Sequence, residues 1–91
     1  MIIHKEVIIK GKVQGVFFRG STKEEAIKLG VNGEVWNMTD GSVILHAEGE
    51  EEKVNALIQW CYTGPTRAEV TEVIIKDNEV KGYKNFTVKR F

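Results

Sequence analysis

The sequence predicts an α+β sandwich in which two helices cover one face of a mostly antiparallel sheet. Three observations support this fold class. Apolar residues alternate with polar ones along several segments, as in strands, and two other segments place apolar residues on one face of a helix, the second of them with the full i, i+3, i+4, i+7 spacing. Turn-forming residues separate these segments, which follow one another as strand, helix, strand, strand, helix and strand, with a short strand at the end.

The first strand is expected at about residues 3–13, followed by a turn at residues 14–16. Successive side chains of a strand point to opposite faces of the sheet, so apolar residues of one parity share a face. In this segment those residues are Ile3, Val7, Ile9 and Val13.

The first helix is expected to end at Gly30, since glycine suits the left-handed position after a helix. Ser21 and Glu24 have the spacing of a capping box, which would start the helix near Thr22. The inner stripe instead favours a start near Phe18, and we expect this earlier start. The stripe consists of Phe18, Thr22, Ala26 and Leu29.

The middle of the chain predicts a hairpin with strands at residues 34–37 and 42–49. The pair Asp40-Gly41 between them is a common hairpin turn. In the second of these strands one face carries Val43, Leu45 and Ala47, and the other face carries Ile44, His46 and Glu48.

The second helix is expected at residues 50–63. Three glutamates at residues 50–52 favour the positive end of its dipole, and Gly64-Pro65 ends it. Its apolar stripe consists of Val54, Leu57, Ile58 and Cys61.

Residues 68–76 predict a last long strand. Its apolar parity changes between Val70 and Val73, so a bulge near Thr71-Glu72 is expected. With a short strand at residues 86–90, the order is βαββαβ plus a C-terminal strand, which is the ferredoxin-like α/β sandwich. We expect both helices on one face of the sheet and solvent on the other. Because this fold serves many functions, it does not identify the chemistry.

Length and charge exclude several classes of protein. With 91 residues, the chain is expected to form a single domain over residues 1–91. Thirteen Lys and Arg balance thirteen Asp and Glu, whereas a nucleic-acid-binding protein needs a basic surplus. No apolar run approaches the roughly 18 residues of a membrane span, and there is no signal-peptide core, so we expect a cytoplasmic protein. A single cysteine excludes an internal disulfide.

The loop before the first helix is the candidate anion site. Gly15 allows backbone conformations that turn consecutive N–H groups toward one point, and Arg19 follows at the start of the helix. Loop amides and a planar guanidinium together suit a phosphate-sized dianion. From the spacing alone, a plain strand-to-helix connection with a solvated arginine is an equal alternative. The segment comprises Gln14, Gly15, Val16, Phe17, Phe18 and Arg19.

Two motifs resemble the signatures of the acylphosphatase family. The first is the run Ile9-x-Gly11-x-Val13-Gln14-Gly15-Val16-x-Phe18-Arg19. The second is the run Gly33-x-Val35-x-Asn37-x-x-x-Gly41-x-Val43, with Gly49 beyond it. Later parts of the chain are also similar to the family, so the resemblance covers nearly the whole chain.

The resemblance implies an enzyme that hydrolyses the carboxyl-phosphate bond of acyl phosphates to a carboxylate and inorganic phosphate. Arg19 and the loop amides would bind the phosphoryl group, and Asn37 would orient the attacking water. From the residues alone, Asn37 is more simply a turn residue before Asp40-Gly41. We expect no metal, no organic cofactor, no nucleic-acid or membrane partner, a monomer, and inorganic phosphate as product and inhibitor.

Two positions depart from the family pattern. The family usually has an aromatic residue at the position of Glu34 and a polar or basic residue at that of Trp36. Both side chains lie on one face of the strand, so the departure is expected to alter the open face of the sheet rather than the anion site. We therefore expect the departure at these two positions to affect the fine preference among substrates.

The remaining candidates favour structural roles. Cys61 lies on an apolar helix stripe, where a cysteine usually belongs to the core. His4 and His46 are interpreted as isolated strand residues, and no cluster has metal-ligand spacing. A mildly basic end of the chain is interpreted as solvated, and it comprises Lys81, Lys84, Lys89 and Arg90.

Two alternatives to the enzyme stay open. One is a non-catalytic acylphosphatase-like domain that binds a ligand or regulates another activity. The other is an RNA-binding ferredoxin-like module, in which aromatic residues on the open sheet face stack on bases. Trp36 could serve such a module, although the strand at residues 42–49 carries no aromatic. Hydrolysis of benzoyl phosphate distinguishes the enzyme from both.

Overall fold

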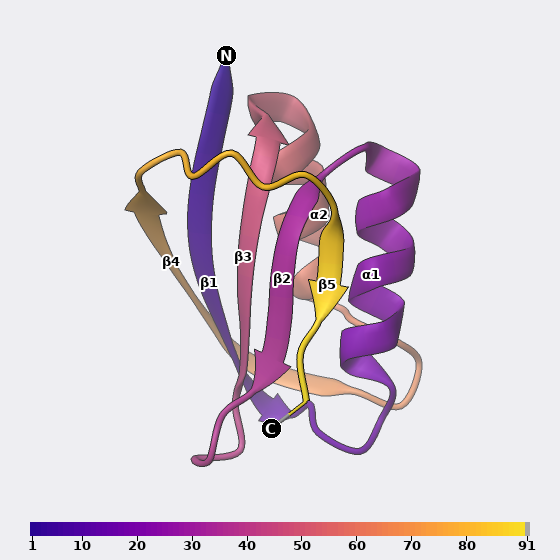
Figure 1. Cartoon of the computed structure of the whole chain (residues 1–91). Helices are drawn as coiled ribbons and strands as arrows, with labels where there is room; N and C mark the ends of the chain where they lie inside the picture. Colours follow the sequence, from indigo (N-terminus) through magenta and orange to yellow (C-terminus); the bar gives the residue numbers. More distant parts are fainter. Residues whose placement is uncertain (91) are drawn as a thin grey trace.

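The structure is a computed structural model that describes residues 1–90. Its elements follow the predicted order (Figure 1), and they are β1 (Ile2–Lys12), α1 (Phe18–Leu29), β2 (Asn32–Asn37), β3 (Val43–Glu50), α2 (Glu51–Cys61), β4 (Glu69–Asn78) and β5 (Phe86–Val88). The five strands form one sheet of order β4-β1-β3-β2-β5. Every neighbouring pair is antiparallel except β2 and β5, which are parallel. The predicted ferredoxin-like fold is confirmed.

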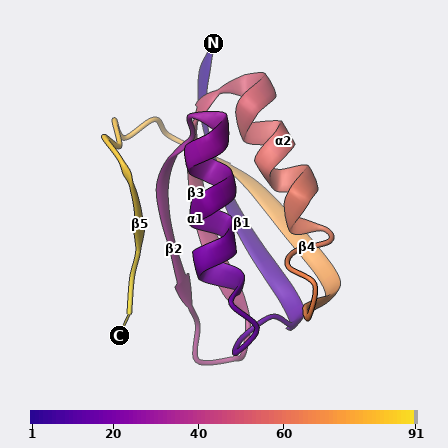
Figure 2. The same ribbon diagram turned by 90° about the vertical axis from the view of Figure 1, so that its right-hand side faces the viewer.

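Both helices lie on the same face of the sheet (Figure 2). The core between the two layers contains the apolar residues that the alternation assigned to this face, which in β3 are Val43, Leu45 and Ala47. The stripe predicted for α2 is buried as expected and consists of Val54, Leu57, Ile58 and Cys61. In the described part of the chain, no helix is both long and apolar enough to cross a membrane.

The start of α1 confirms the prediction made from the apolar stripe and not the one made from the capping box. The helix begins at Phe18, its preceding residue Phe17 has a left-handed backbone with φ of 64°, and no side chain caps it. The Phe18 side chain is buried against the core, whereas a start at Thr22 would leave it outside the helix. At the other end Gly30 has φ of 74°, as predicted for the residue after a helix.

The bulge predicted in the last long strand is present. Lys10 of β1 pairs with Glu72, and the next residue Gly11 pairs with Val70, so Thr71 is the extra residue of β4. Gly11 has φ of 125°, and a Cβ added there would lie 2.1 Å from the Glu69 carbonyl oxygen. The bulge therefore brings the two backbones too close for any other residue.

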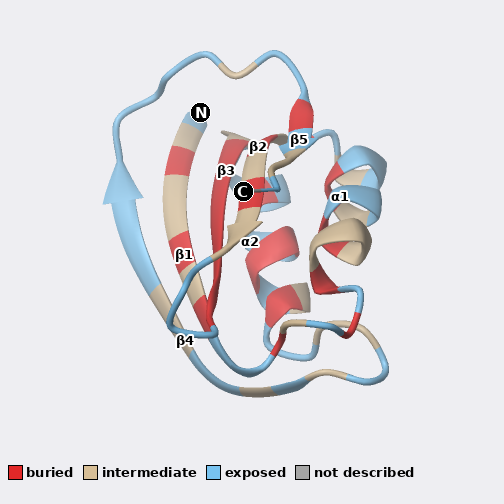
Figure 3. Ribbon diagram, turned by 60° about the horizontal axis from the view of Figure 1, so that its bottom comes forward, coloured by how far each residue is buried: buried red, intermediate tan, exposed pale blue. Residues whose placement is uncertain are grey.

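The second face of the sheet is only partly open to solvent, which corrects the prediction of an open face. Residues 79–83, here called the strap, cross this face in front of β1 and β3 (Figure 1). The Glu48 carboxylate accepts hydrogen bonds from the backbone N–H groups of Lys81, Gly82 and Tyr83, at 2.6, 2.8 and 2.8 Å. As a result β3 is buried on both faces over most of its length (Figure 3). The correction arises because the strap supplies backbone donors to a carboxylate far away in the sequence.

His4 and His46 are not isolated, which corrects a second interpretation. His4 Nε2 lies 2.9 Å from His46 Nδ1, and His4 Nδ1 lies 2.6 Å from the Glu79 carbonyl oxygen of the strap. A carbonyl oxygen only accepts, so His4 Nδ1 carries a hydrogen and donates it to the strap. Burial and the neighbouring His4 lower the pKa of His46, against the opposing effect of Glu6 and Glu34. The two histidines therefore connect β1 and β3 to the strap.

Candidate active site

A hollow of about 200 Å³ lies where the loop before α1 meets the end of β2. We call it the loop hollow, and its lining residues are Val13, Gly15, Phe17, Phe18, Arg19, Gly20, Asn37 and Arg90. The only charged residues in this lining are the two arginines, and no carboxylate is among them. The loop hollow is therefore suited to an anion.

The loop leaves its amides unpaired. Gly15 and Phe17 both have positive φ, 74° and 64°, which turns the chain sharply between β1 and α1. Within residues 1–90, the N–H groups of residues 15–17 donate no turn or cap hydrogen bond, and the first amides of a helix lack partners by geometry. These groups lie beside the positive end of the α1 dipole, so an anion bound there would satisfy them.

Arg19 lies in the first turn of α1 and is half-buried. Its Nη1 donates a hydrogen bond of 3.3 Å to the Lys89 carbonyl oxygen, beyond the end of β5. A guanidinium has five N–H donors in a planar fork, so most of them stay available to a ligand in the loop hollow. The start of the helix and the end of the chain together place this side chain.

Asn37 is the last residue of β2 and shares parity with the buried Val35, so it lies on the helix side of the sheet as predicted. Its Oδ1 is buried and has no hydrogen-bond partner among the described residues. Such an acceptor typically costs about 1–3 kcal/mol of stability. A water bound in the loop hollow would supply the missing donor.

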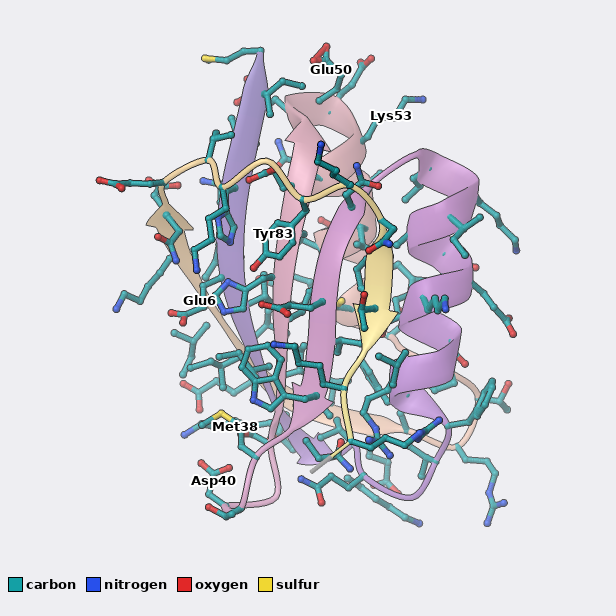
Figure 4. The ribbon with its side chains drawn as sticks, viewed as in Figure 1. Glu6, Met38, Asp40, Glu50, Lys53 and Tyr83 are labelled. Atoms are coloured by element: carbon teal, nitrogen blue, oxygen red, sulfur yellow. The ribbon has the colours of Figure 1, made fainter. Side chains whose placement is uncertain are left out.

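The hairpin turn is made by other residues than Asn37. Asp40 Oδ1 accepts hydrogen bonds from the backbone N–H and the hydroxyl of Ser42, at 3.0 and 2.6 Å. These hydrogen bonds from Ser42 lower the pKa of Asp40. Figure 4 shows Asp40 at the outer tip of this turn. The alternative role of Asn37 as a turn residue therefore has no contact to support it.

Gln14 joins the loop to the hairpin rather than lining the loop hollow. Its Nε2 donates to the carbonyl oxygens of Met38 and Ser42, at 2.8 and 2.9 Å. This bridge holds the end of β2, and with it Asn37, against the loop that carries Gly15. The sequence placed Gln14 in the phosphate-binding segment but held no signal for this contact, which joins residues 24 and 28 positions apart.

The other loop residues divide between core and surface. Val16 and Phe18 are buried, whereas the Phe17 side chain is 66% exposed. The Phe17 ring covers Gly20, where an added Cβ would come within 2.4 Å of the ring. Arg90 also lines the loop hollow, which the sequence did not indicate because basic residues near a chain end are usually solvated.

Metal-ligating and nucleophilic groups are sparse. Among residues 1–90, no three His, Cys, Asp or Glu side chains are grouped so that they could hold a metal ion. Cys61 is buried in the core, and this burial raises the pKa of its thiol to about 12. A thiol that stays protonated at neutral pH is no nucleophile.

Comparison with known proteins identifies the family of this chain. The acylphosphatase family model matches residues 5–88. An acylphosphatase of Geobacter sulfurreducens is 47% identical over 90 residues, which cover 98% of this chain and 99% of the relative. The chain belongs to the acylphosphatase family. The acylphosphatase structure from Coxiella burnetii is also similar, with a TM-score of 0.93 and 38% identity over 97% of this chain and 93% of that chain. The one from Bacillus subtilis has a TM-score of 0.94 and 30% identity over 99% and 100% of the two chains.

The match covers nearly the whole length of these relatives. The protein is an acylphosphatase, an enzyme that hydrolyses small-molecule acyl phosphates.

Proposed function

We propose that the acylphosphatase reaction takes place in the loop hollow, with Arg19 and the amides of residues 15–19 binding the phosphoryl group. A phosphoryl group carries its charge on oxygens that accept hydrogen bonds from amides and from a guanidinium. Unpaired N–H groups at a helix start favour a dianion over a neutral ligand. The absence of a carboxylate from the lining supports the same role.

Asn37 orients the attacking water. The observation that supports this role best is its buried Oδ1, which has no partner among residues 1–90 and faces the same hollow as Arg19. A water that donates to this oxygen is held by one hydrogen, and its lone pair is free to attack phosphorus. An amide is too weak a base to take the proton, so it positions the water without deprotonating it.

The reaction balances without a further acid or base from the protein. The water oxygen forms a bond to phosphorus while the bond from phosphorus to the acyl oxygen breaks. The acyl oxygen leaves with its electron pair as a carboxylate, and the proton of the water moves to a phosphate oxygen. A carboxylate is a good leaving group, so positioning and charge stabilisation by Arg19 and the amides suffice.

The experiment is the hydrolysis of benzoyl phosphate, followed by absorbance, with inorganic phosphate as inhibitor. We expect turnover in the presence of a chelator, and competitive inhibition because phosphate occupies the same amides. A folded protein that binds phosphate but hydrolyses no acyl phosphate would instead be a non-catalytic member of the family.

RNA binding has little support in this structure. The Trp36 ring stacks on His46, with centroids 5.5 Å apart and planes 14° apart, and Lys89 lies 5.2 Å from its centroid. These contacts occupy an aromatic ring that an RNA-binding sheet would present to bases. The strap also covers part of the same face.

We also propose that the enzyme acts as a cytoplasmic monomer. One chain supplies every lining residue of the loop hollow, so the site needs no second copy. Light scattering coupled to size-exclusion chromatography tests the monomer, and a dimer at working concentration would contradict it.

A further inference from the structure

Lys89, which contacts Arg19, is itself held in place by its backbone and by its side chain. Its carbonyl oxygen accepts the hydrogen bond from Arg19 Nη1. Its backbone N–H donates to the Val35 carbonyl oxygen at 2.9 Å, which extends the pairing of β5 with β2 by one residue. Lys89 therefore connects the middle of β2 to the guanidinium that we place on the phosphoryl group.

The side chain of Lys89 contacts two residues of β2, Glu34 and Trp36. Its Nζ lies 2.7 Å from Glu34 Oε1 and 5.2 Å from the centroid of the Trp36 ring. Glu34 also accepts a hydrogen bond of 2.8 Å from the Tyr83 hydroxyl of the strap. Figure 4 shows Tyr83 in front of the sheet, on the same side as the strap. We call Glu34, Trp36 and Lys89 the clamp.

The fold favours the ionised form of the Glu34 carboxyl. Partial burial opposes ionisation of Glu34, but the hydrogen bonds from Lys89 and Tyr83 outweigh it and lower the pKa of this carboxyl. The carboxylate side chain is only 17% exposed, so solvent screens this ion pair less than it screens a fully exposed one. A second ion pair, between Lys5 and Asp77, joins β1 to β4 away from the loop hollow, with an Asp77 side chain that is 86% exposed.

We infer that Glu34, Trp36 and Lys89 form a clamp that positions Arg19 for the phosphoryl group. This inference rests on the proposed role of Arg19. The three residues are positioning residues, since only the Lys89 carbonyl touches Arg19 and none of them lines the loop hollow. The clamp also gives a physical meaning to the departure at residues 34 and 36, because a carboxylate and an aromatic ring there create a site for the Lys89 ammonium.

The test measures the inhibition constant of inorganic phosphate together with KM and kcat for benzoyl phosphate. Lys89→Met removes the ammonium and keeps most of the chain length, and Glu34→Gln removes the charge with little change in shape. We expect each to raise the phosphate inhibition constant and KM by about 3- to 5-fold, the range of a modest ion pair. Lys89→Arg is expected to restore both constants, because a guanidinium pairs with Glu34 and stacks on Trp36.

Lys5→Met is the matched control, because it breaks the other lysine–carboxylate pair. We expect it to leave the phosphate inhibition constant unchanged and to lower the melting temperature no more than Lys89→Met does, because the Asp77 side chain is 86% exposed. Unchanged phosphate inhibition in Lys89→Met and Glu34→Gln, in an active and folded enzyme, would overturn the clamp. A wild-type protein without turnover would overturn the proposed function instead, so the two failures are distinguishable.

A second hollow carries an independent inference about the acyl group. It lies between α1 and the segment of residues 84–90, has a volume of about 1000 Å³, and we call it the groove. Phe17, Gly20 and Arg90 line both the groove and the loop hollow, so the two are continuous. A substrate whose phosphoryl group contacts Arg19 can therefore extend its acyl group into the groove.

The lining of the groove indicates the chemistry of that acyl group. Apolar surface is present at Ile27, which is 63% exposed, and at Phe17. The charged lining residues are three cations, Lys23, Lys84 and Arg90, and one carboxylate, Glu24. This excess of positive charge is complementary to an anionic group at the far end of an acyl chain. We propose that the groove selects acyl phosphates whose acyl group carries a second negative charge.

The test compares 4-carboxybenzoyl phosphate with 4-methylbenzoyl phosphate, which have similar shapes and differ in one charge. We expect the wild type to favour the carboxylated substrate in kcat/KM, and Lys84→Met to reduce that preference by about 3- to 5-fold. Added salt should reduce it in the same direction. Lys76→Met, on β4 at the opposite edge of the sheet, is the control and should leave it unchanged.

Two results would overturn the inference about the groove. One is a wild type that hydrolyses the methylated substrate at least as well as the carboxylated one. The other is an unchanged preference in the double variant Lys23→Met, Lys84→Met. Failure of the proposed function would look different, since neither substrate would then be hydrolysed.

Discussion

At the loop before α1, the amides of residues 15–17 and Asn37 Oδ1 lack partners among the described residues. On the second face of the sheet, in contrast, the Glu48 carboxylate accepts three backbone N–H groups of the strap. Both regions place polar groups at the edge of the core. Only the loop before α1 leaves such groups without a hydrogen-bond partner among the described residues.

This difference between the two regions indicates which of them binds a ligand. An unpaired buried polar group destabilises the fold, whereas a carboxylate with three donors stabilises it. Under the proposed function, the partners missing from the loop hollow are supplied by the substrate and the attacking water. On the face under the strap the protein itself supplies the partners, so we expect His4, His46 and Glu48 to contribute to stability rather than to catalysis.

The largest effect is expected from Arg19→Ala. Arginines that contact a transferred phosphoryl group contribute about 10³–10⁵ in rate, so residual hydrolysis of benzoyl phosphate should be very low. Phosphate inhibition should also be lost, because the guanidinium contacts the anion before reaction. Circular dichroism should show an intact fold. Near-normal turnover in this variant would contradict the proposal that the reaction takes place in the loop hollow.

Asn37→Ala separates the two roles within the loop hollow. We expect kcat to fall by about 10²–10³-fold, the usual cost of losing one positioned polar group, with phosphate inhibition nearly normal. The free energy of unfolding should stay equal or rise, because the removed Oδ1 has no partner among residues 1–90. A variant that loses phosphate affinity and keeps kcat would reverse the assigned roles.

Glu48→Ala tests the other side of the comparison. The substitution leaves three backbone N–H groups of the strap without their acceptor, so the free energy of unfolding should fall by about 3 kcal/mol. Turnover of the folded enzyme should stay within a few-fold of the wild type. Glu50→Ala, which removes an exposed partner of the N-terminus, is the control and should cost little. Equal stability of the two variants in urea unfolding would contradict the role of Glu48.

The smallest effect concerns pH. The pKa of His46 is lower in the fold than its ordinary 6.5, through burial and His4. Below pH 6.5 the unfolded chain therefore binds a proton that the folded protein does not, and the free energy of unfolding falls as the pH drops. The charged groups around it are Glu6 on β1, Glu34 on β2 and Lys81 of the strap.

His46→Gln should flatten this dependence between pH 6.5 and 5, measured by urea unfolding at each pH. The activity at neutral pH should hardly change, since His46 does not line the loop hollow. An unchanged pH dependence in this variant would show that other groups titrate in this range.

Much of the fold follows from local sequence. Parity of apolar residues placed β1 and β3, the change of parity predicted the bulge at Thr71, and the apolar stripe predicted the start of α1 at Phe18. Arg19 and Asn37 were both proposed for the site from the sequence, and the structure brings them to one hollow. These features depend on neighbours within one element, where period and turn chemistry are informative.

Only the tertiary structure revealed the strap, the histidine pair, the bridge of Gln14 and the clamp. Each joins segments far apart in the chain, such as His4 with Glu79, 75 positions away, or Arg19 with Lys89, 70 positions away. Residue type shows that His46, Glu48 and Glu34 are polar, but it does not show which groups form hydrogen bonds with them in the fold. The sequence by itself determined which face of each element is apolar, and the packing of the chain decided which polar groups are satisfied and which are left for a ligand.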